Sequence, residues 1–294
     1  MIKVYGTLQN KLLDFVEECI YEIAPQNWVL NYNHFNKVTQ LEGYFSSKTD
    51  ADEEIRKLSE ITKFNFFSAL SVTEISNEDW ENSYKKHFKP WRIGKFHWIP
   101  IWCKETFSVP DDELKIFLDP GMAFGTGNHE TTKLCLECMV LISQKLNTKE
   151  KQDFIDVGSG SGILALTASI LGFEKVCAVD SDEIAIKVSK ENADLNSLEN
   201  INFISSPIQN LQTYKKYDFV VANIQADILL TNSKRLIDLL QPEGYLLLSG
   251  ILESEVDFVH SHFENVFNSL NKKVTSKKKG MNEWSLSQFQ LLSN

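Results

Sequence analysis

The sequence is poor in cysteine and has no long apolar run. Five cysteines among 294 residues, an odd number at irregular spacing, do not form a disulfide framework and are typical of a reducing compartment. No stretch reaches the roughly 18 apolar residues that a membrane-spanning helix needs. The first residues, Met1 to Val4, lack the features of a secretory signal. We therefore expect a cytoplasmic protein.

The sequence also lacks an excess of positive charge. Thirty Lys and Arg residues against forty Asp and Glu residues leave a formal net charge of −10. This balance disfavours non-specific binding to nucleic-acid backbones and favours a basic partner. Because 43% of the residues are hydrophobic, a disordered chain is excluded, and the length allows two domains.

Residues 1–77 have the pattern of a small domain that mixes strands and helices. Strand-like segments at 2–5, 28–30, 38–45 and 70–75 alternate with helical patterns at 12–23 and 50–61. The order βαββαβ predicts a ferredoxin-like α+β sandwich. Residues 1–78 hold seven basic and twelve acidic side chains, and such a surface attracts a Lys-rich partner.

The rest of the chain predicts a linker and a larger α/β domain. Residues 78–92 are polar and aromatic, and we predict a linker helix there, followed by a domain over 93–294. The tail segments 271–276 and 283–289 flank a Lys-rich turn and predict an antiparallel edge hairpin. Five short apolar runs predict parallel strands that are buried on both faces of a Rossmann-like sheet, at residues 153–157, 176–180, 201–204, 219–222 and 245–249.

A glycine loop follows the first of these strands. Gly158, Gly160 and Gly162 allow a tight turn and the close approach of a ligand to the backbone. The dinucleotide fingerprint requires a further glycine at the position of Ile163. The G-x-G-x-G spacing therefore favours a cofactor without phosphates over a nicotinamide cofactor, and a purely structural loop stays as the alternative.

Polar side chains end two other predicted strands. Asp180 lies 22 residues after Gly158 and can accept hydrogen bonds from ribose hydroxyls, although a helix N-cap would suit the segment as well. Asn223 follows the strand at 219–222, where open α/β sheets hold ligands, and a turn residue is the alternative there. We expect the three strand ends to form one cofactor site.

A longer motif connects these features. Residues 119–132 read D-P-G-x-A-F-G-T-G-x-H-x-T-T, and with the glycine loop and the Ala-Asn-Ile segment they resemble the bacterial methyltransferases of ribosomal large-subunit protein eleven. The resemblance covers most of the chain. It implies the seven-stranded class I methyltransferase sheet, S-adenosylmethionine as cofactor, and methylation of lysine side chains and the N-terminal amine of that ribosomal protein, which the N-terminal domain would recognise.

The resemblance also implies the site residues. Cofactor contacts would come from Thr132, Gly158, Gly160, Gly162, Asp180 and Asn223, with Phe124, Gly125, Thr126 and Gly127 over the methionine end. Asn223 could in addition orient the incoming amine. His129 is a candidate base that titrates near neutrality, but it could equally hydrogen-bond the loop backbone.

Other features favour a flexible amine and leave alternatives open. Residues 223–226 read Asn-Ile-Gln-Ala rather than the Asn-Pro-Pro-aromatic box that grips a planar amine. An RNA methyltransferase, or a non-catalytic cofactor-binding module in ribosome assembly, remains as the alternative function.

Cys135 and Cys138 predict a buried helix rather than a metal site. We expect His260 and His262 to lie at the surface. We expect Lys272–Lys279 to form a solvated edge with at most incidental RNA contact. We also expect the protein to be a monomer.

Overall fold

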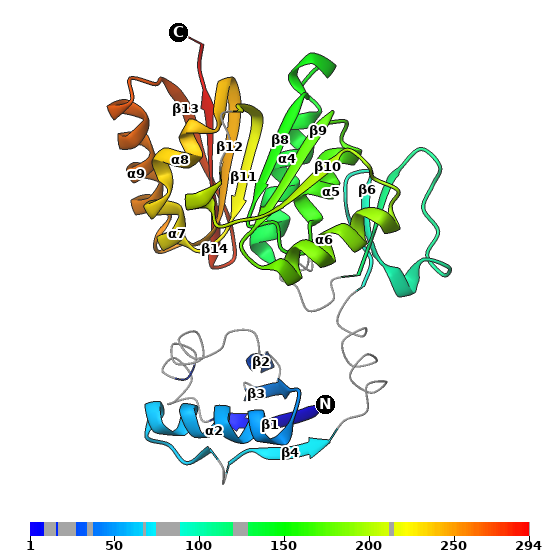
Figure 1. Ribbon diagram of the computed structural model, residues 1–294, viewed down its shortest axis with the longest axis vertical. Helices are drawn as coiled ribbons and strands as arrows, with labels where there is room; N and C mark the ends of the chain where they lie inside the picture. Colours follow the sequence, from blue (N-terminus) through cyan, green and yellow to red (C-terminus); the bar gives the residue numbers. More distant parts are fainter. Residues whose placement is uncertain are drawn as a thin grey trace. The chain divides into compact units, whose positions relative to one another are not determined.

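The structure, a computed structural model, divides into two compact units, residues 1–87 and 88–294 (Figure 1). In the part of the chain described, no helix is long and apolar enough to span a membrane. The described residues are 1–8, 16, 28–33, 38–66, 69–74, 89–119, 129–211 and 215–293.

The first unit contains a four-stranded antiparallel sheet in the order β2-β3-β1-β4. Strand β3 lies between β2 and β1, and strand β1 lies between β3 and β4. This is the split βαβ arrangement expected for a ferredoxin-like domain. Of the first predicted helix, only Val16 lies among the described residues, and it is helical and buried. The strands are β1 (Ile2–Leu8), β2 (Trp28–Asn33), β3 (Val38–Phe45) and β4 (Ser71–Glu74).

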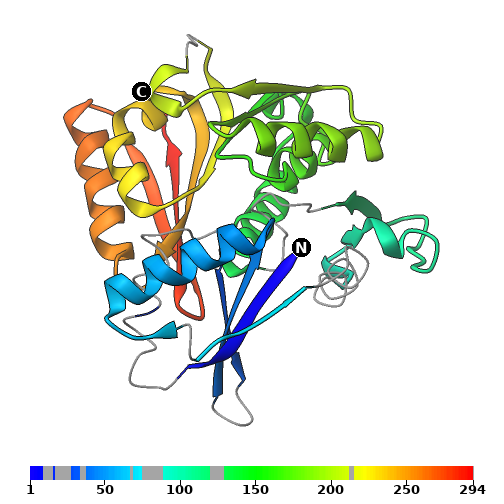
Figure 2. The same cartoon turned by 60° about the horizontal axis from the view of Figure 1, so that its bottom comes forward.

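Helix α2 (Lys48–Thr62) covers one face of this sheet (Figure 2). The helix begins at Ser47, whose Oγ accepts a hydrogen bond from the Asp50 amide at 3.1 Å, and it ends at Lys63, which has a left-handed φ of 56°. The side chains that it buries recur at helical spacing and pack against β1 and β3. They are Ala51, Ile55, Leu58 and Thr62.

The second unit is built on a seven-stranded sheet in the order β10-β9-β8-β11-β12-β14-β13. Strands β10, β9, β8, β11 and β12 are parallel, and β14 runs antiparallel to β12 and to β13. The predicted strands are therefore present in the predicted architecture. Their bounds are β8 (Asp153–Val157), β9 (Lys175–Asp180), β10 (Ile201–Ser205), β11 (Tyr217–Asn223), β12 (Leu240–Leu252), β13 (Val274–Met281) and β14 (Trp284–Leu291).

Helices cover both faces of this sheet (Figure 1). Alternate strand residues face the two sides, so that Phe154 packs with α4 and α5 while Ile155 packs with the helices that follow β11. One face carries α4 (Glu130–Ser143), α5 (Ile163–Ile170) and α6 (Glu183–Leu195). The other carries α7 (Ala226–Thr231), α8 (Ser233–Asp238) and α9 (Val256–Ser269). Short 3₁₀ turns lie at Ile101–Cys103, Thr148–Glu150 and Ile208–Asn210.

A small third sheet, not predicted from the sequence, packs on α5 and α6 in the order β5-β6-β7. Its bounds are β5 (Trp91–Ile93), β6 (Phe96–Pro100) and β7 (Leu114–Leu118). The buried Trp98 indole donates a hydrogen bond to Thr167 Oγ1 at 3.1 Å, which ties β6 to α5. Trp91 and Arg92 thus begin a strand rather than ending the linker helix, and residues 78–88 of that predicted helix lie outside the described part.

Two predictions for the C-terminal part are wrong. Lys277, Lys278 and Lys279 lie in edge strand β13, and the turn falls at Asn282, whose φ is 53°. His260 is buried, only 8% exposed, with its ring nitrogens 3.2 Å from Ser287 Oγ and Ser276 Oγ. Position 260 falls on the sheet-facing side of an amphipathic helix, so its burial follows from helical periodicity and not from the spacing of metal ligands.

Burial makes His260 a source of acid sensitivity. Its pKa is lowered by burial and by Lys278, although Glu264 and Asp257 act in the opposite direction. As the pH falls below about 6.5, His260 binds a proton in the unfolded chain before it does so in the folded protein. The free energy of unfolding therefore falls as the pH falls, until the pH reaches the lower pKa that His260 has in the folded state. We expect His260→Gln to weaken this acid-side loss in urea unfolding between pH 7.5 and 5.5. Parallel profiles for the two proteins would contradict the assignment.

Candidate functional site

The three predicted strand ends meet at the carboxyl edge of the parallel strands. Gly158 follows β8, Asp180 ends β9, and Asn223 ends β11. The pairings Val157 with Val179 and Val157 with Ala222 bring these ends onto three adjacent strands. This is the edge at which open α/β sheets bind their ligands.

The glycine loop depends on backbone angles that favour glycine. Gly158, Gly160 and Gly162 have φ values of 76°, 52° and 82°. The amides of Gly158 and Ser159 both donate to the Val179 carbonyl, at 2.8 and 3.0 Å, which attaches the loop to β9. A Cβ on Gly158 would lie 2.2 Å from Ile224 Cγ2. The loop therefore has no room for a side chain at its first position.

Asp180 holds the loop from the end of the neighbouring strand. Its Oδ2 accepts from the Gly160 amide at 2.8 Å and its Oδ1 from the Asp182 amide at 3.0 Å. The N-cap of α6 is Asp182, whose Oδ1 accepts from the Ile184 amide at 2.8 Å, so Asp180 is not the helix cap. A carboxylate has about four acceptor sites, which leaves capacity for the two hydroxyls of a ribose.

Asn223 brings a buried and incompletely bonded amide to the same edge. The residue is 9% exposed, and its Nδ2 donates to Oγ1 of the fully buried Thr132 at 3.2 Å. Its Oδ1 is buried and has no hydrogen-bond donor among the described residues. Because buried polar atoms are generally paired, this oxygen is a candidate acceptor for a donor on a ligand.

His129 caps helix α4. Its Nδ1 lies 3.3 Å from the Thr131 amide, which donates to it, and 2.8 Å from Thr131 Oγ1, while its ring packs edge-on against Trp284. Burial lowers its pKa. His129 thus bonds to backbone at the start of α4; the loop backbone that was the expected alternative partner lies outside the described residues. The preceding loop residues, Phe124, Gly125, Thr126 and Gly127, lie outside the described part.

Asp156 is a site residue to which the sequence assigned no role. It is fully buried before the glycine loop, and its Oδ2 accepts from the Ala165 amide at 3.2 Å, so it joins β8 to the start of α5. Burial, with a smaller contribution from the Asp180 carboxylate, raises its pKa to about 8. The carboxyl group is therefore largely protonated at neutral pH. Its place in the D-x-G-x-G run was the only available signal.

Nothing in the sequence marks Asn192 as a residue of the site, and its role was not predicted. It lies fully buried near the C-terminal end of α6. Its Nδ2 donates to the carbonyls of Asp119 and Ser161, at 2.9 and 3.0 Å, and its Oδ1 accepts from the Asp119 amide at 2.8 Å. One side chain thereby connects the residue after β7 to the glycine loop.

The two cysteines of the C-x-x-C segment lie on α4, as predicted. Cys135 and Cys138 are buried, and burial raises the pKa of both thiols. Within the described ranges, no group of three or more His, Cys, Asp or Glu side chains is arranged to hold a metal ion.

Comparison with known proteins identifies the family. The model of the family described as ribosomal protein L11 methyltransferase (PrmA) matches residues 9–289. The chain belongs to this family. The ribosomal protein L11 methyltransferase of Caldanaerobacter subterraneus subsp. tengcongensis is 37% identical over 257 residues, which are 82% of this chain and 80% of the relative. That of Caldicellulosiruptor saccharolyticus is 36% identical over 271 residues, 89% and 85% of the two chains.

A solved structure supports the same assignment. The ribosomal protein L11 methylase from Lactobacillus delbrueckii subsp. bulgaricus matches with a TM-score of 0.59 and 28% identity, covering 70% of this chain and 100% of that chain. The predicted family, the α/β fold with a seven-stranded sheet and the methyltransferase class are confirmed.

S-adenosylmethionine is the cofactor of this class, and the carboxyl edge fits it. Asp180 supplies a carboxylate with free acceptor capacity for the ribose, and Asn223 Oδ1 is a buried acceptor without a donor among the described residues. The glycine loop presents backbone without side chains at Gly158. Unlike a dinucleotide site, the edge lacks the third fingerprint glycine, because Ile163 occupies that position.

Gly158→Ala should separate backbone strain from steric overlap. A left-handed φ costs a non-glycine residue about 1–2 kcal/mol, and at Gly158 the Ile224 clash adds to it. Gly172→Ala is the matched control, because Gly172 has a φ of 92° and a Cβ added there would meet nothing within 4 Å. We expect Gly158→Ala to lower the free energy of unfolding more than Gly172→Ala does, and to weaken cofactor binding in calorimetry. Equal losses of stability would show that the overlap has no energetic effect.

Proposed function

We propose that this protein transfers methyl groups from S-adenosylmethionine to amines of ribosomal protein L11, namely lysine side chains and the N-terminal amine. The match of the family model to residues 9–289 carries the proposal. The polar carboxyl edge supports it, since Gly158, Asp180 and Asn223 would hold the cofactor there. In this proposal Thr132, Gly160 and Gly162 complete the contacts of the described part, and the 124–127 loop covers the methionine end.

The chain contributes mainly by positioning. When bound, the cofactor supplies an activated methyl group on a positively charged sulfur. The nucleophile, the methyl carbon and the sulfur must be collinear, and good alignment can contribute up to roughly 7–11 kcal/mol. Asn223 would orient the amine through its unpaired Oδ1, and the bond from its Nδ2 to Thr132 would keep that oxygen directed at the reacting atoms.

The substrate amine must be neutral before it can react. A lysine with an ordinary pKa near 10.4 is protonated at pH 7. Burial beside a positive charge lowers this pKa, because both desolvation and like charge disfavour the ammonium form. Water can then remove the proton. His129 already caps α4 through Nδ1, so we assign it a helix-capping role and no obligatory role as base.

The alternatives fit the residues less well. An RNA methyltransferase that grips a planar base is disfavoured by Ile224 and Gln225, which follow Asn223 in place of the two prolines of the base-gripping box. A non-catalytic cofactor-binding module would bind the cofactor at the same edge but would transfer no methyl group, so the labelling experiment below separates it from an enzyme.

The two units would have separate tasks. Residues 1–77 would recognise the basic ribosomal protein, residues 78–92 would link the units, and residues 93–294 would carry out methyl transfer. The acidic balance of residues 1–78, seven basic against twelve acidic side chains, supports the recognition role because opposite charge accelerates encounter. We propose that the enzyme acts as a monomer in the cytoplasm, where its substrate is made.

Labelled cofactor tests the activity directly. The protein is incubated with methyl-labelled S-adenosylmethionine and equal amounts of ribosomal protein L11 and ribosomal RNA. We expect label in L11, and at least about tenfold less label with Asp180→Ala or Asn223→Ala, since each removes a polar group proposed to bind the cofactor. Asp182→Ala is the control: it loses the α6 cap but keeps Asp180. Label in RNA, or cofactor binding without any transfer, would favour one of the alternatives.

Neutralising acidic side chains on α2 tests the recognition role. Because long-range attraction affects encounter rather than chemistry, Asp52→Asn with Glu60→Gln should raise KM for L11 about threefold and leave kcat unchanged. Glu191→Gln with Asp194→Asn on α6 removes the same charge from the other unit and serves as the control. Equal changes in KM for the two pairs would argue against recognition by the first unit.

A further inference from the structure

A basic cavity lies at the edge of the sheet opposite the cofactor site. It has a volume of about 520 Å³ and is lined from the segment before β11 and from α7 to the end of α8. Because β11 is parallel to β8 and β12, the start of β11 marks the amino edge, whereas Gly158 and Asn223 lie at the carboxyl edge. One acidic residue, Asp238, and four cationic residues line this cavity: Lys215, Lys216, Lys234 and Arg235.

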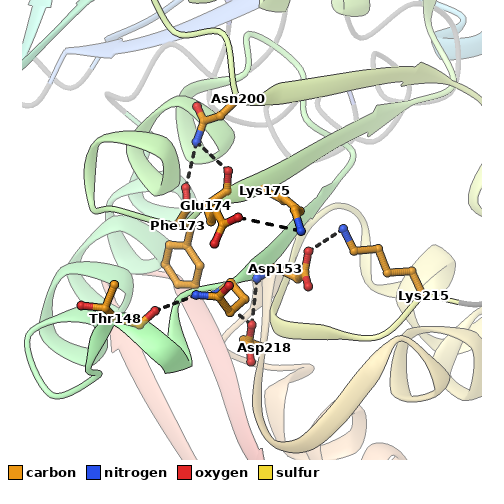
Figure 3. A network of polar contacts seen from close by, with 9 residues as sticks. Thr148, Asp153, Phe173, Glu174, Lys175, Asn200, Lys215 and Asp218 are labelled. Carbon is orange, nitrogen blue, oxygen red and sulfur yellow. Dashed lines mark hydrogen bonds and ion pairs between the residues drawn. The ribbon is translucent and has the colours of Figure 1, made fainter.

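Two of these lysines are held in place by the amino edge. Lys215 Nζ lies 2.5 Å from Asp153 Oδ1 (Figure 3). It also packs over the Tyr217 ring, 5.5 Å from the ring centroid. Lys216 donates to the carbonyl of Asp238, at the end of α8, where helix carbonyls attract cations. Their positions are therefore fixed by the fold, and two ordered ammonium groups form one wall of the cavity.

The edge that carries them is itself rigid. Asp218 Oδ2 accepts from the amides of Gln152 and Asp153, at 3.1 and 2.8 Å, and links the starts of β8 and β11 (Figure 3). The Asn200 side chain closes the neighbouring turn by donating to the Phe173 carbonyl at 2.8 Å. A binding wall on such a framework needs little ordering when a ligand arrives.

Arg235 supplies the observation that points to a ligand. Its Nε is buried and has no acceptor among the described residues. A buried guanidinium N–H without an acceptor is costly, and an arginine fork matches the oxygens of a phosphate group. Lys234, its exposed neighbour on α8, adds a cation at the rim.

We propose that this cavity is a phosphate-binding site, in which Arg235 and Lys234 bind the phosphate oxygens beside the wall formed by Lys215 and Lys216. The chain as a whole carries a net charge of −10, so a concentration of cations around one cavity is a local feature and not a general property of the surface. The site is independent of methyl transfer. Its ligand is a phosphate group, either a free one or one carried by an RNA backbone.

The Nε–H resonance of Arg235 in NMR spectra of the full chain tests the proposal. Inorganic phosphate, added at constant ionic strength, should shift this resonance with saturation. Lys234→Gln should weaken binding about tenfold, as expected for the loss of a charged hydrogen-bond donor. Lys190→Gln, an exposed lysine on α6, is the matched control and should leave binding unchanged. Arg235→Lys identifies the resonance by removing it.

Competition distinguishes the sources of phosphate. A short single-stranded RNA that competes with phosphate at this site, with a strong salt dependence, assigns the site to RNA backbone. RNA without effect, beside saturable phosphate binding, assigns it to free phosphate compounds. The proposal is overturned if chloride or polyglutamate shifts the resonance as phosphate does, if the shift does not saturate, or if Lys234→Gln binds phosphate like the wild type.

Discussion

The parallel alignment of β9, β8 and β11 is the constraint on which the site depends. Parallel strands end at the same edge, so this alignment delivers Asp180, Gly158 and Asn223 to one place although 65 residues of sequence separate the first glycine from the amide. The alignment is maintained by strands buried on both faces. A one-residue slip of β11 would turn Phe219 and Val221 toward the wrong helices.

Polar side chains then adjust what the sheet has brought together. Asp180 holds the glycine loop through the Gly160 amide, and Asp156 holds the start of α5, which follows the loop, through the Ala165 amide. Asn192 holds the loop from α6 through the Ser161 carbonyl. Each of these side chains gives a backbone N–H or C=O group the hydrogen-bond partner that water would otherwise have to supply. The loop can therefore keep three left-handed glycines without losing a defined shape.

Much of this could be predicted from the sequence, for identifiable reasons. The apolar runs at 153–157 and 219–222 are typical of strands that are buried on both faces of a sheet. The spacing between the glycine loop and the carboxylate of the next strand end is typical of a nucleoside-binding site. The β5-β6-β7 sheet could not be predicted, because its short strands show little alternation of polar and apolar residues. They depend on contacts between residues far apart in the sequence, such as Trp98 and Thr167, which are 69 positions apart. Asn192 is a further case: its partners are distant, and nothing local marks it.

The lysines of β13 show how the open end of the sheet is protected. Lys278 pairs with Asp257 on α9, and Lys279 pairs with Glu137 on α4, so the two helices draw ammonium groups to opposite faces of the last strand. An incoming strand from another molecule would have to bury these charges in order to extend the ladder. The outermost strand can thus stay exposed at high concentration in a crowded cell without seeding fibrous aggregates.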